Sequence, residues 1–201
     1  MILDITLIGF LAGIIGTGCG GILSILFKKN VDRYLDFFMG ISGGIMLAVV
    51  VFDLMKESMN EIGILNTVVF TFLGVIATML IKSKLDVSKE MKTGYLIFIS
   101  ILLHNLPEGL AIGSSFMSTQ NLGMTLAIII GIHNIPEGLA MALSLIGSKV
   151  RTSKVILFTI IAGIPMGIGS FLGAYFGREF YSLIGVFLSI AAGTMMYVVL
   201  E

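Results

Sequence analysis

The chain has few charged residues and a single cysteine, and each of these shortages excludes classes of protein. Of its 201 residues only 12% are Asp, Glu, Lys or Arg, whereas an average globular protein has roughly a quarter. The net charge is zero and no basic cluster is interleaved with aromatic residues, which excludes a nucleic-acid-binding protein. Cys19 is the single cysteine, so an intrachain disulfide and a CxxC metal or redox motif are excluded.

Apolar residues fill long stretches instead, making up 57% of the chain with a mean hydropathy of +1.07. A membrane-spanning helix needs about 20 mostly apolar residues, and these stretches lack the period-two alternation of a barrel wall. Each is bounded by charge or a polar turn, and together they cover 2–27, 34–57, 62–81, 94–117, 122–147, 154–177 and 180–200. The sequence therefore predicts an all-α, polytopic transmembrane helical bundle with seven spans, forming a single transmembrane domain over 1–201.

The distribution of lysine and arginine predicts how this bundle is oriented. Ten of the twelve cationic residues fall in the connections 28–33, 82–93 and 148–154, and only Lys56 and Arg178 fall on the opposite side. Cytoplasmic loops of membrane proteins carry the excess of Lys and Arg. We therefore expect these three connections in the cytoplasm and the N-terminus outside.

One polar hexapeptide occurs twice within the apolar stretches. HNLPEG begins at His104 and HNIPEG begins at His133, and the two copies contain both histidines and two of the three prolines of the chain. Each copy starts about 11 residues into its span, near the middle of the bilayer. Identical motifs at equal depth on antiparallel helices imply a pseudo-two-fold axis in the membrane plane, as in inverted-repeat transporters.

The spacing within each copy is suited to binding cations. His104 and Glu108 are four residues apart and project from one helical face, while Asn105 lies on the adjoining edge. Glu108 could therefore share one cation with His104 and another with Asn105. The second copy repeats this set, and the candidate ligands are His104, Asn105, Glu108, His133, Asn134 and Glu137. Imidazole, carboxylate and amide ligands without thiolate suit Zn²⁺, Fe²⁺, Mn²⁺ or Co²⁺ better than Cu⁺.

The same motif argues against an enzyme. In HExxH zinc hydrolases a glutamate beside the first histidine acts as the general base, and here Asn105 and Asn134 occupy that position. The metal is then a transported substrate, with no cofactor expected. Two alternatives to a carrier stay open: a metal-gated channel with a continuous path, and an intramembrane protein that binds metal without transporting it.

Further acidic residues lie near the predicted outer end of the second stretch. Asp53 and Glu57 are four residues apart and could form an acidic mouth that concentrates cations before they bind. Glu57 is equally compatible with a solvated helix end beside Lys56. Glu201 follows the final apolar stretch and is either a site residue or a simple terminus.

The paired motif resembles that of the ZIP (Zrt/Irt-like) divalent metal transporters, most of all the prokaryotic GufA and ZupT branches. Segments 163–167 (GIPMG) and 192–197 (AGTMMY) extend the resemblance. It implies import of zinc, and also of iron, manganese, cobalt or cadmium, across the inner membrane into the cytoplasm. It also implies a binuclear site at the midplane, with the histidines and glutamates binding the transported ion and Asn105 and Asn134 helping to form the second position.

Three features depart from that family's pattern. Many relatives carry a glutamate where this chain has Ile164, and some carry an aspartate where it has Asn134. The family has eight helices, whereas seven apolar stretches are present here. Because ZIP transporters tend to dimerise, the resemblance also implies a homodimer embedded in the lipid bilayer.

Overall fold

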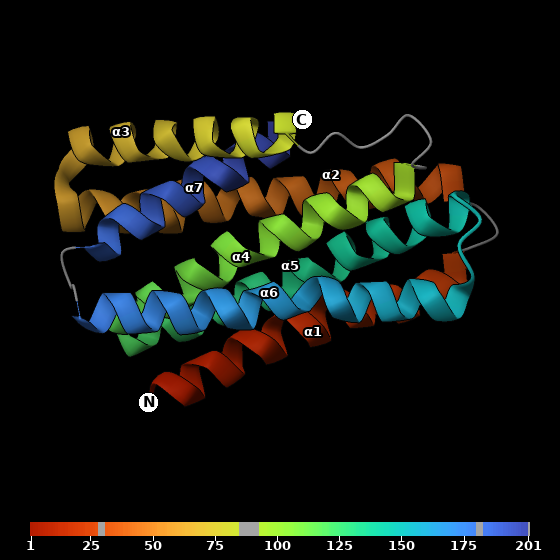
Figure 1. The fold of residues 1–201 in the computed structure, drawn as a ribbon, viewed down its shortest axis with the longest axis horizontal. Helices are drawn as coiled ribbons and strands as arrows, with labels where there is room; N and C mark the ends of the chain where they lie inside the picture. Colours follow the sequence, from red (N-terminus) through yellow and green to blue (C-terminus); the bar gives the residue numbers. More distant parts are fainter. Residues whose placement is uncertain (28–30, 85–92, 180–182, 201) are drawn as a thin grey trace.

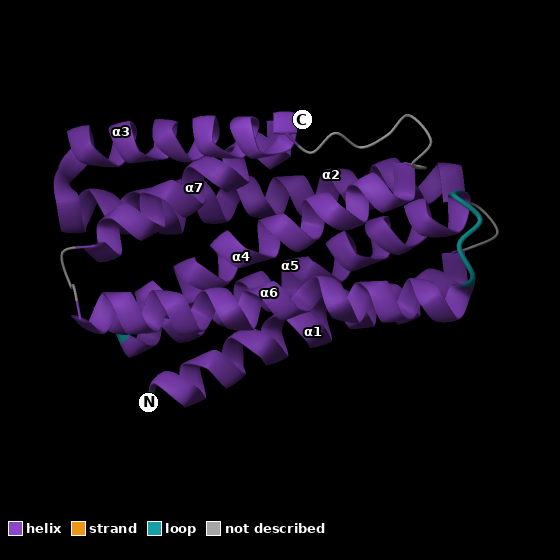
Figure 2. Cartoon of the chain, viewed as in Figure 1, coloured by secondary structure: helices purple, strands orange, loops and turns teal. Residues whose placement is uncertain are grey.

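The computed structural model describes residues 1–201 except 28–30, 85–92, 180–182 and 201, and the described elements are all helical (Figures 1 and 2). In chain order they are α1 (Ile2–Phe27), α2 (Val31–Val49), the π-helical segment η1 (Val50–Leu54), α3 (Met55–Lys84), α4 (Thr93–Ser118), α5 (Gln120–Gly147), α6 (Thr152–Glu179) and α7 (Ile184–Leu200). No strand occurs among these residues. The prediction of an all-α bundle is confirmed.

The outer surface of the bundle is suited to a membrane. Four segments of the described chain are long and apolar enough to cross one: Ile2–Phe27, Gly43–Leu80, Gln120–Gly147 and Thr152–Gly177. Large apolar side chains such as Leu65 and Phe72 are exposed on α3. That all seven predicted stretches cross the membrane stays a prediction, as does the orientation of the bundle. The lysines of connections 28–33 and 82–93 lie largely outside the described residues, and Glu201 lies wholly outside them.

The second predicted stretch differs most from the structure. Its helix does not end at residue 57 but continues through α2, η1 and the beginning of α3 to Gly63. Gly63 has φ 79° and ψ 162°, a conformation that glycine adopts without the steric penalty of a side chain. The chain reverses there, and the rest of α3 runs back beside α7 (Figure 1).

The repeated motif lies at the centre of the bundle. α5 packs against α1 and α2, while α4 packs against α6 and α7, and α4 and α5 also contact each other. α1, α4, α5 and α6 form one group, with α2, α3 and α7 beside it (Figure 1). The described polar side chains of both copies are buried among these helices, whereas Leu106 of the first copy is exposed.

Glycines allow these helices to approach closely. A Cβ atom on Gly109, the last residue of the first hexapeptide, would collide with the carbonyl oxygen of Met166 in α6. A Cβ atom on Gly138, the last residue of the second, would collide with the carbonyl of Thr17 in α1. Small residues at helix interfaces permit such backbone contact in membrane bundles. The two copies thus make equivalent contacts, α4 with α6 and α5 with α1.

Candidate metal site

The two copies of the motif meet through a histidine and a glutamate. His133 Nε2 in α5 lies 2.7 Å from Glu108 Oε1 in α4, and both side chains are fully buried. Ionisable groups within membrane segments are costly and mark functional sites by default. This contact joins one candidate ligand from each copy of the motif.

A third side chain completes a compact group of potential ligands. Glu137, one turn after His133, is 3% exposed, and one ligand atom from each of Glu108, His133 and Glu137 lies within 4.8 Å of the others. A metal ion with bonds of about 2.0–2.2 Å to nitrogen and oxygen requires ligands gathered in this way. The three residues supply one imidazole and two carboxylates, which is the composition of a borderline-to-hard cation site.

The two asparagines are anchored on α6 by their amide nitrogens. Asn105 Nδ2 donates to the carbonyl oxygen of Ala162 at 2.6 Å, and Asn134 Nδ2 lies 3.7 Å from Met166 Sδ. Their Oδ1 atoms, together with His133 Nδ1, are buried and have no hydrogen-bond partner. Because leaving a buried acceptor unsatisfied is unfavourable, these oxygens are suited to binding a cation.

The structure describes the remaining predicted ligand only in part. The backbone of His104 lies in α4, one helical turn before Glu108. Its side chain lies outside the described part of the structure, so its place in the ligand set stays a prediction.

Helices α4, α5 and α6 each contain one internal proline: Pro107, Pro136 and Pro165. Proline cannot donate its backbone hydrogen bond, so each interrupts the helical ladder. Backbone freed in this way is tolerated in a membrane only against protein or a water-filled cavity. Two of the three interruptions lie within the repeated motif itself.

The acidic mouth stays a prediction, and the structure shows what surrounds its two residues. Glu57 is half-buried and accepts a hydrogen bond from Ser118 Oγ at 2.7 Å, and the same hydroxyl lies 3.3 Å from Glu61 Oε1. Glu57 is therefore held against the end of α4 rather than lying at a solvated helix end. Asp53 lies in η1 and is half-buried. Sequence reasoning missed Glu61 and Ser118, although the i, i+4 spacing of Glu57 and Glu61 was a usable signal.

The structure also shows where the side chains of α6 lie relative to the motif. Ile164 is 38% exposed, whereas Met166 is fully buried and contacts Asn134. Met166 is thus one α6 side chain that lies beside the motif, and Ser170, whose Oγ donates to the Gly109 carbonyl at 3.1 Å, is another.

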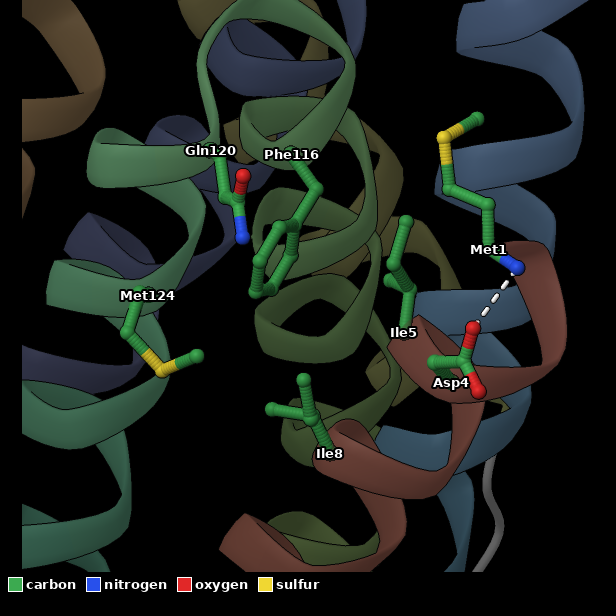
Figure 3. A pocket seen from close by; sticks show the side chains of 7 residues that line it. All are labelled: Met1, Asp4, Ile5, Ile8, Phe116, Gln120 and Met124. Carbon is green, nitrogen blue, oxygen red and sulfur yellow. Dashed lines mark ion pairs between the residues drawn. The ribbon is translucent and has the colours of Figure 1, made fainter.

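A separate cavity of about 230 Å³ lies between the beginning of α1 and the α4–α5 connection (Figure 3). Its lining residues include none of the repeated motif and are Met1, Asp4, Ile5, Ile8, Phe116, Gln120 and Met124. The Met1 amino group pairs with Asp4 at 2.6 Å, and the dashed line in Figure 3 marks this ion pair. The cavity is therefore distinct from the buried Glu108–His133 contact.

Comparison with known proteins assigns the family. A family model described as ZIP Zinc transporter matches residues 81–201. The zinc transporter ZupT of Chlorobium chlorochromatii is 30% identical over 218 residues, which cover 93% of this chain and 81% of the relative. The zinc transporter ZIPB of Bordetella bronchiseptica is 28% identical over 213 residues, covering 96% of this chain and 69% of the relative.

The chain belongs to the ZIP family of metal transporters. This confirms the resemblance carried by the repeated motif. Membership places the chain among membrane transporters rather than enzymes, with a divalent metal ion as transported substrate rather than as cofactor.

Proposed function

We propose that the chain imports a divalent transition metal across a prokaryotic inner membrane into the cytoplasm, and that this metal is zinc in the first place. The N-terminus lies outside, and α4 and α5 carry the transport site. The observation that supports this most strongly is the buried contact between Glu108 and His133, with Glu137 close by. Iron, manganese, cobalt and cadmium fit the same ligand types, because selectivity among these metals depends on geometry more than on ligand identity.

The first metal position is formed by His104, Glu108, His133 and Glu137. Each helix contributes one histidine and one glutamate, so an ion bound here joins the two halves of the repeat. Because the described ligand atoms already lie within 4.8 Å of one another, binding needs only small side-chain movements.

A second position uses the asparagine oxygens and shares the two glutamates. The bonds from Asn105 and Asn134 to α6 fix the amide nitrogens and leave each Oδ1 as the acceptor. Bridging carboxylates would hold two cations close together and offset their mutual repulsion.

Transport requires that this site open to each side in turn. Movement of α4 and α5 against the other helices would provide this, as in transporters built from inverted repeats. A homodimer, implied by the family resemblance, is a further part of the proposal.

Zinc flux into proteoliposomes loaded with an impermeant fluorescent indicator tests the proposal. The purified chain is compared with His104→Ala/Glu108→Ala, with equilibrium zinc binding measured on the same samples. Asp4→Asn is the matched control. Asp4 carries a carboxylate, lies in α1 far along the chain from the motif, and in the described contacts pairs only with the Met1 amino group. Flux that is lost in the double variant and retained in the control supports the proposal, whereas binding without flux in the unmodified chain contradicts transport.

A further inference from the structure

The two repeats share one more polar residue than the hexapeptide. Ser115 follows Glu108 by seven residues, and Ser144 follows Glu137 by seven residues. Seven residues turn an α-helix through about 700°, which is about 20° short of two full turns, and advance it by about 10.5 Å. Each serine therefore lies on the same face of its helix as the glutamate, two turns closer to the helix C-terminus.

The hydroxyls of these two serines are buried without a hydrogen-bond partner, which is rare among the described serines and threonines. Ser115 is 0% exposed and Ser144 is 6% exposed, and neither Oγ has a hydrogen-bond partner. A helical serine usually bonds to the carbonyl one turn back, as Ser114 Oγ does to Leu110 at 2.6 Å. Thr71, the other buried hydroxyl without a partner in the described chain, lies in α3 outside the repeats.

Neither serine lies on the tightly packed face of its helix. α4 meets α6 through Gly109 and Gly113, and by helical periodicity Ser115 lies on the opposite side, with Glu108. α5 meets α1 through Gly138, and Ser144 again lies on the side of Glu137. Because α4 and α5 run antiparallel, the two serines lie on opposite sides of the Glu108–His133 contact along the transport direction.

We propose that Ser115 and Ser144 are transient ion-binding positions, one on each side of the midplane site. Each hydroxyl would accept the divalent cation or hydrogen-bond to its bound water as the ion moves between the membrane surface and the glutamates. A neutral hydroxyl suits this role, since conduction requires binding that is favourable enough to admit an ion and weak enough to release it. The inference rests on the proposed transport function and assigns residues to its two half-pathways.

Serine-to-alanine substitution separates this role from a structural one. Ser115→Ala and Ser144→Ala each remove a hydroxyl that bonds to no other group. The fold should therefore be unchanged, and the zinc affinity at the midplane should stay within twofold of that of the unmodified chain. Zinc flux should fall at least fivefold in each variant. Ser114→Ala is the matched control, being a neighbouring buried serine with a satisfied hydroxyl, and its flux should be unchanged. Flux within twofold of the unmodified chain in both test variants would overturn the proposal.

Cysteine accessibility supplies a second readout that does not depend on the alanine variants. Cys19 is the only cysteine, so Cys19→Ala gives a background without thiols, into which Ser115→Cys or Ser144→Cys is introduced. A membrane-impermeant thiol reagent should modify the two positions from opposite sides, and bound zinc should slow both reactions. Modification of both from the same side, or of neither, would overturn the proposal.

The unmodified chain and Glu108→Gln distinguish the two levels of inference. If the unmodified chain carries no zinc, the proposed function fails. Suppose instead that the unmodified chain carries zinc, that Glu108→Gln abolishes flux, and that the serine variants transport normally. In that case only the assignment of Ser115 and Ser144 fails.

Discussion

Glu108 and His133 are 25 residues apart in the sequence, yet His133 Nε2 lies 2.7 Å from Glu108 Oε1 in the middle of the bundle. Each comes from one copy of the duplicated hexapeptide. A buried ionisable pair contributes little net stability, because the desolvation of both groups offsets their attraction. We propose that its place at the contact between the repeats serves metal binding rather than stabilisation of the fold.

Glu108→Gln and His133→Gln should each weaken zinc binding at least tenfold, equivalent to about 1.4 kcal/mol. The double variant should lose little more than either single one, because both residues bind the same ion and effects within one site are not additive. Isothermal titration of the four proteins measures this directly. Losses that simply add would mean that the two residues bind separate ions.

The asparagines should determine how many ions bind. The unmodified chain should bind two zinc ions, and Asn105→Ala/Asn134→Ala should bind one, because the amide oxygens contribute only to the second position. Metal analysis after gel filtration at saturating zinc gives the stoichiometry. A single ion in the unmodified chain would contradict the binuclear arrangement.

Much of the site was predictable because it is local in sequence. The i, i+4 spacing of His133 and Glu137 and the repetition of the hexapeptide were sufficient to predict a ligand group near the middle of two antiparallel helices. The turn at Gly63 was not predicted, because charged residues such as Glu57 suggested an earlier helix end. The structure instead holds Glu57 through Ser118 of α4, a contact between distant segments that no local pattern indicates.

Which α6 side chain lies beside the motif also depends on packing. The family resemblance marked Ile164 as a departure from the glutamate of many relatives; in the structure Ile164 is partly exposed and Met166 is buried beside Asn134. The rotation of α6 is set by its backbone contacts with Gly109 and Gly113 of α4. Such contacts become visible only once the helices are assembled.

Gly109→Ala should destabilise the bundle by about 1–3 kcal/mol, because the added methyl group would overlap the Met166 carbonyl and force α4 away from α6. Gly44→Ala in α2 is the control, since nothing lies within 4 Å of a Cβ atom built there. The control should be neutral or slightly stabilising, as expected for glycine replaced by alanine in a helix. Thermal unfolding in detergent compares the two, and an equally stable Gly109→Ala variant would contradict the close α4–α6 contact.

Glu57→Gln should raise the KM for zinc transport severalfold and leave the maximal rate nearly unchanged, because an acidic mouth concentrates cations without binding them during transport. The effect should shrink at higher salt, since charges are screened beyond about 10 Å at 0.1 M ionic strength. Initial rates at low and high ionic strength test this, with Asp4→Asn as the control. A salt-independent KM would show that Glu57 serves only to hold Ser118.

Crystals of the zinc-loaded protein, measured on both sides of the zinc absorption edge, test the central claim most directly. The account predicts an anomalous difference peak between α4 and α5, within about 2.0–2.2 Å of His133 Nε2 and of carboxylate oxygens from Glu108 and Glu137. The peak should be absent in His133→Gln/Glu108→Gln crystals. A zinc peak elsewhere in the bundle, with none between these three side chains, would contradict the account.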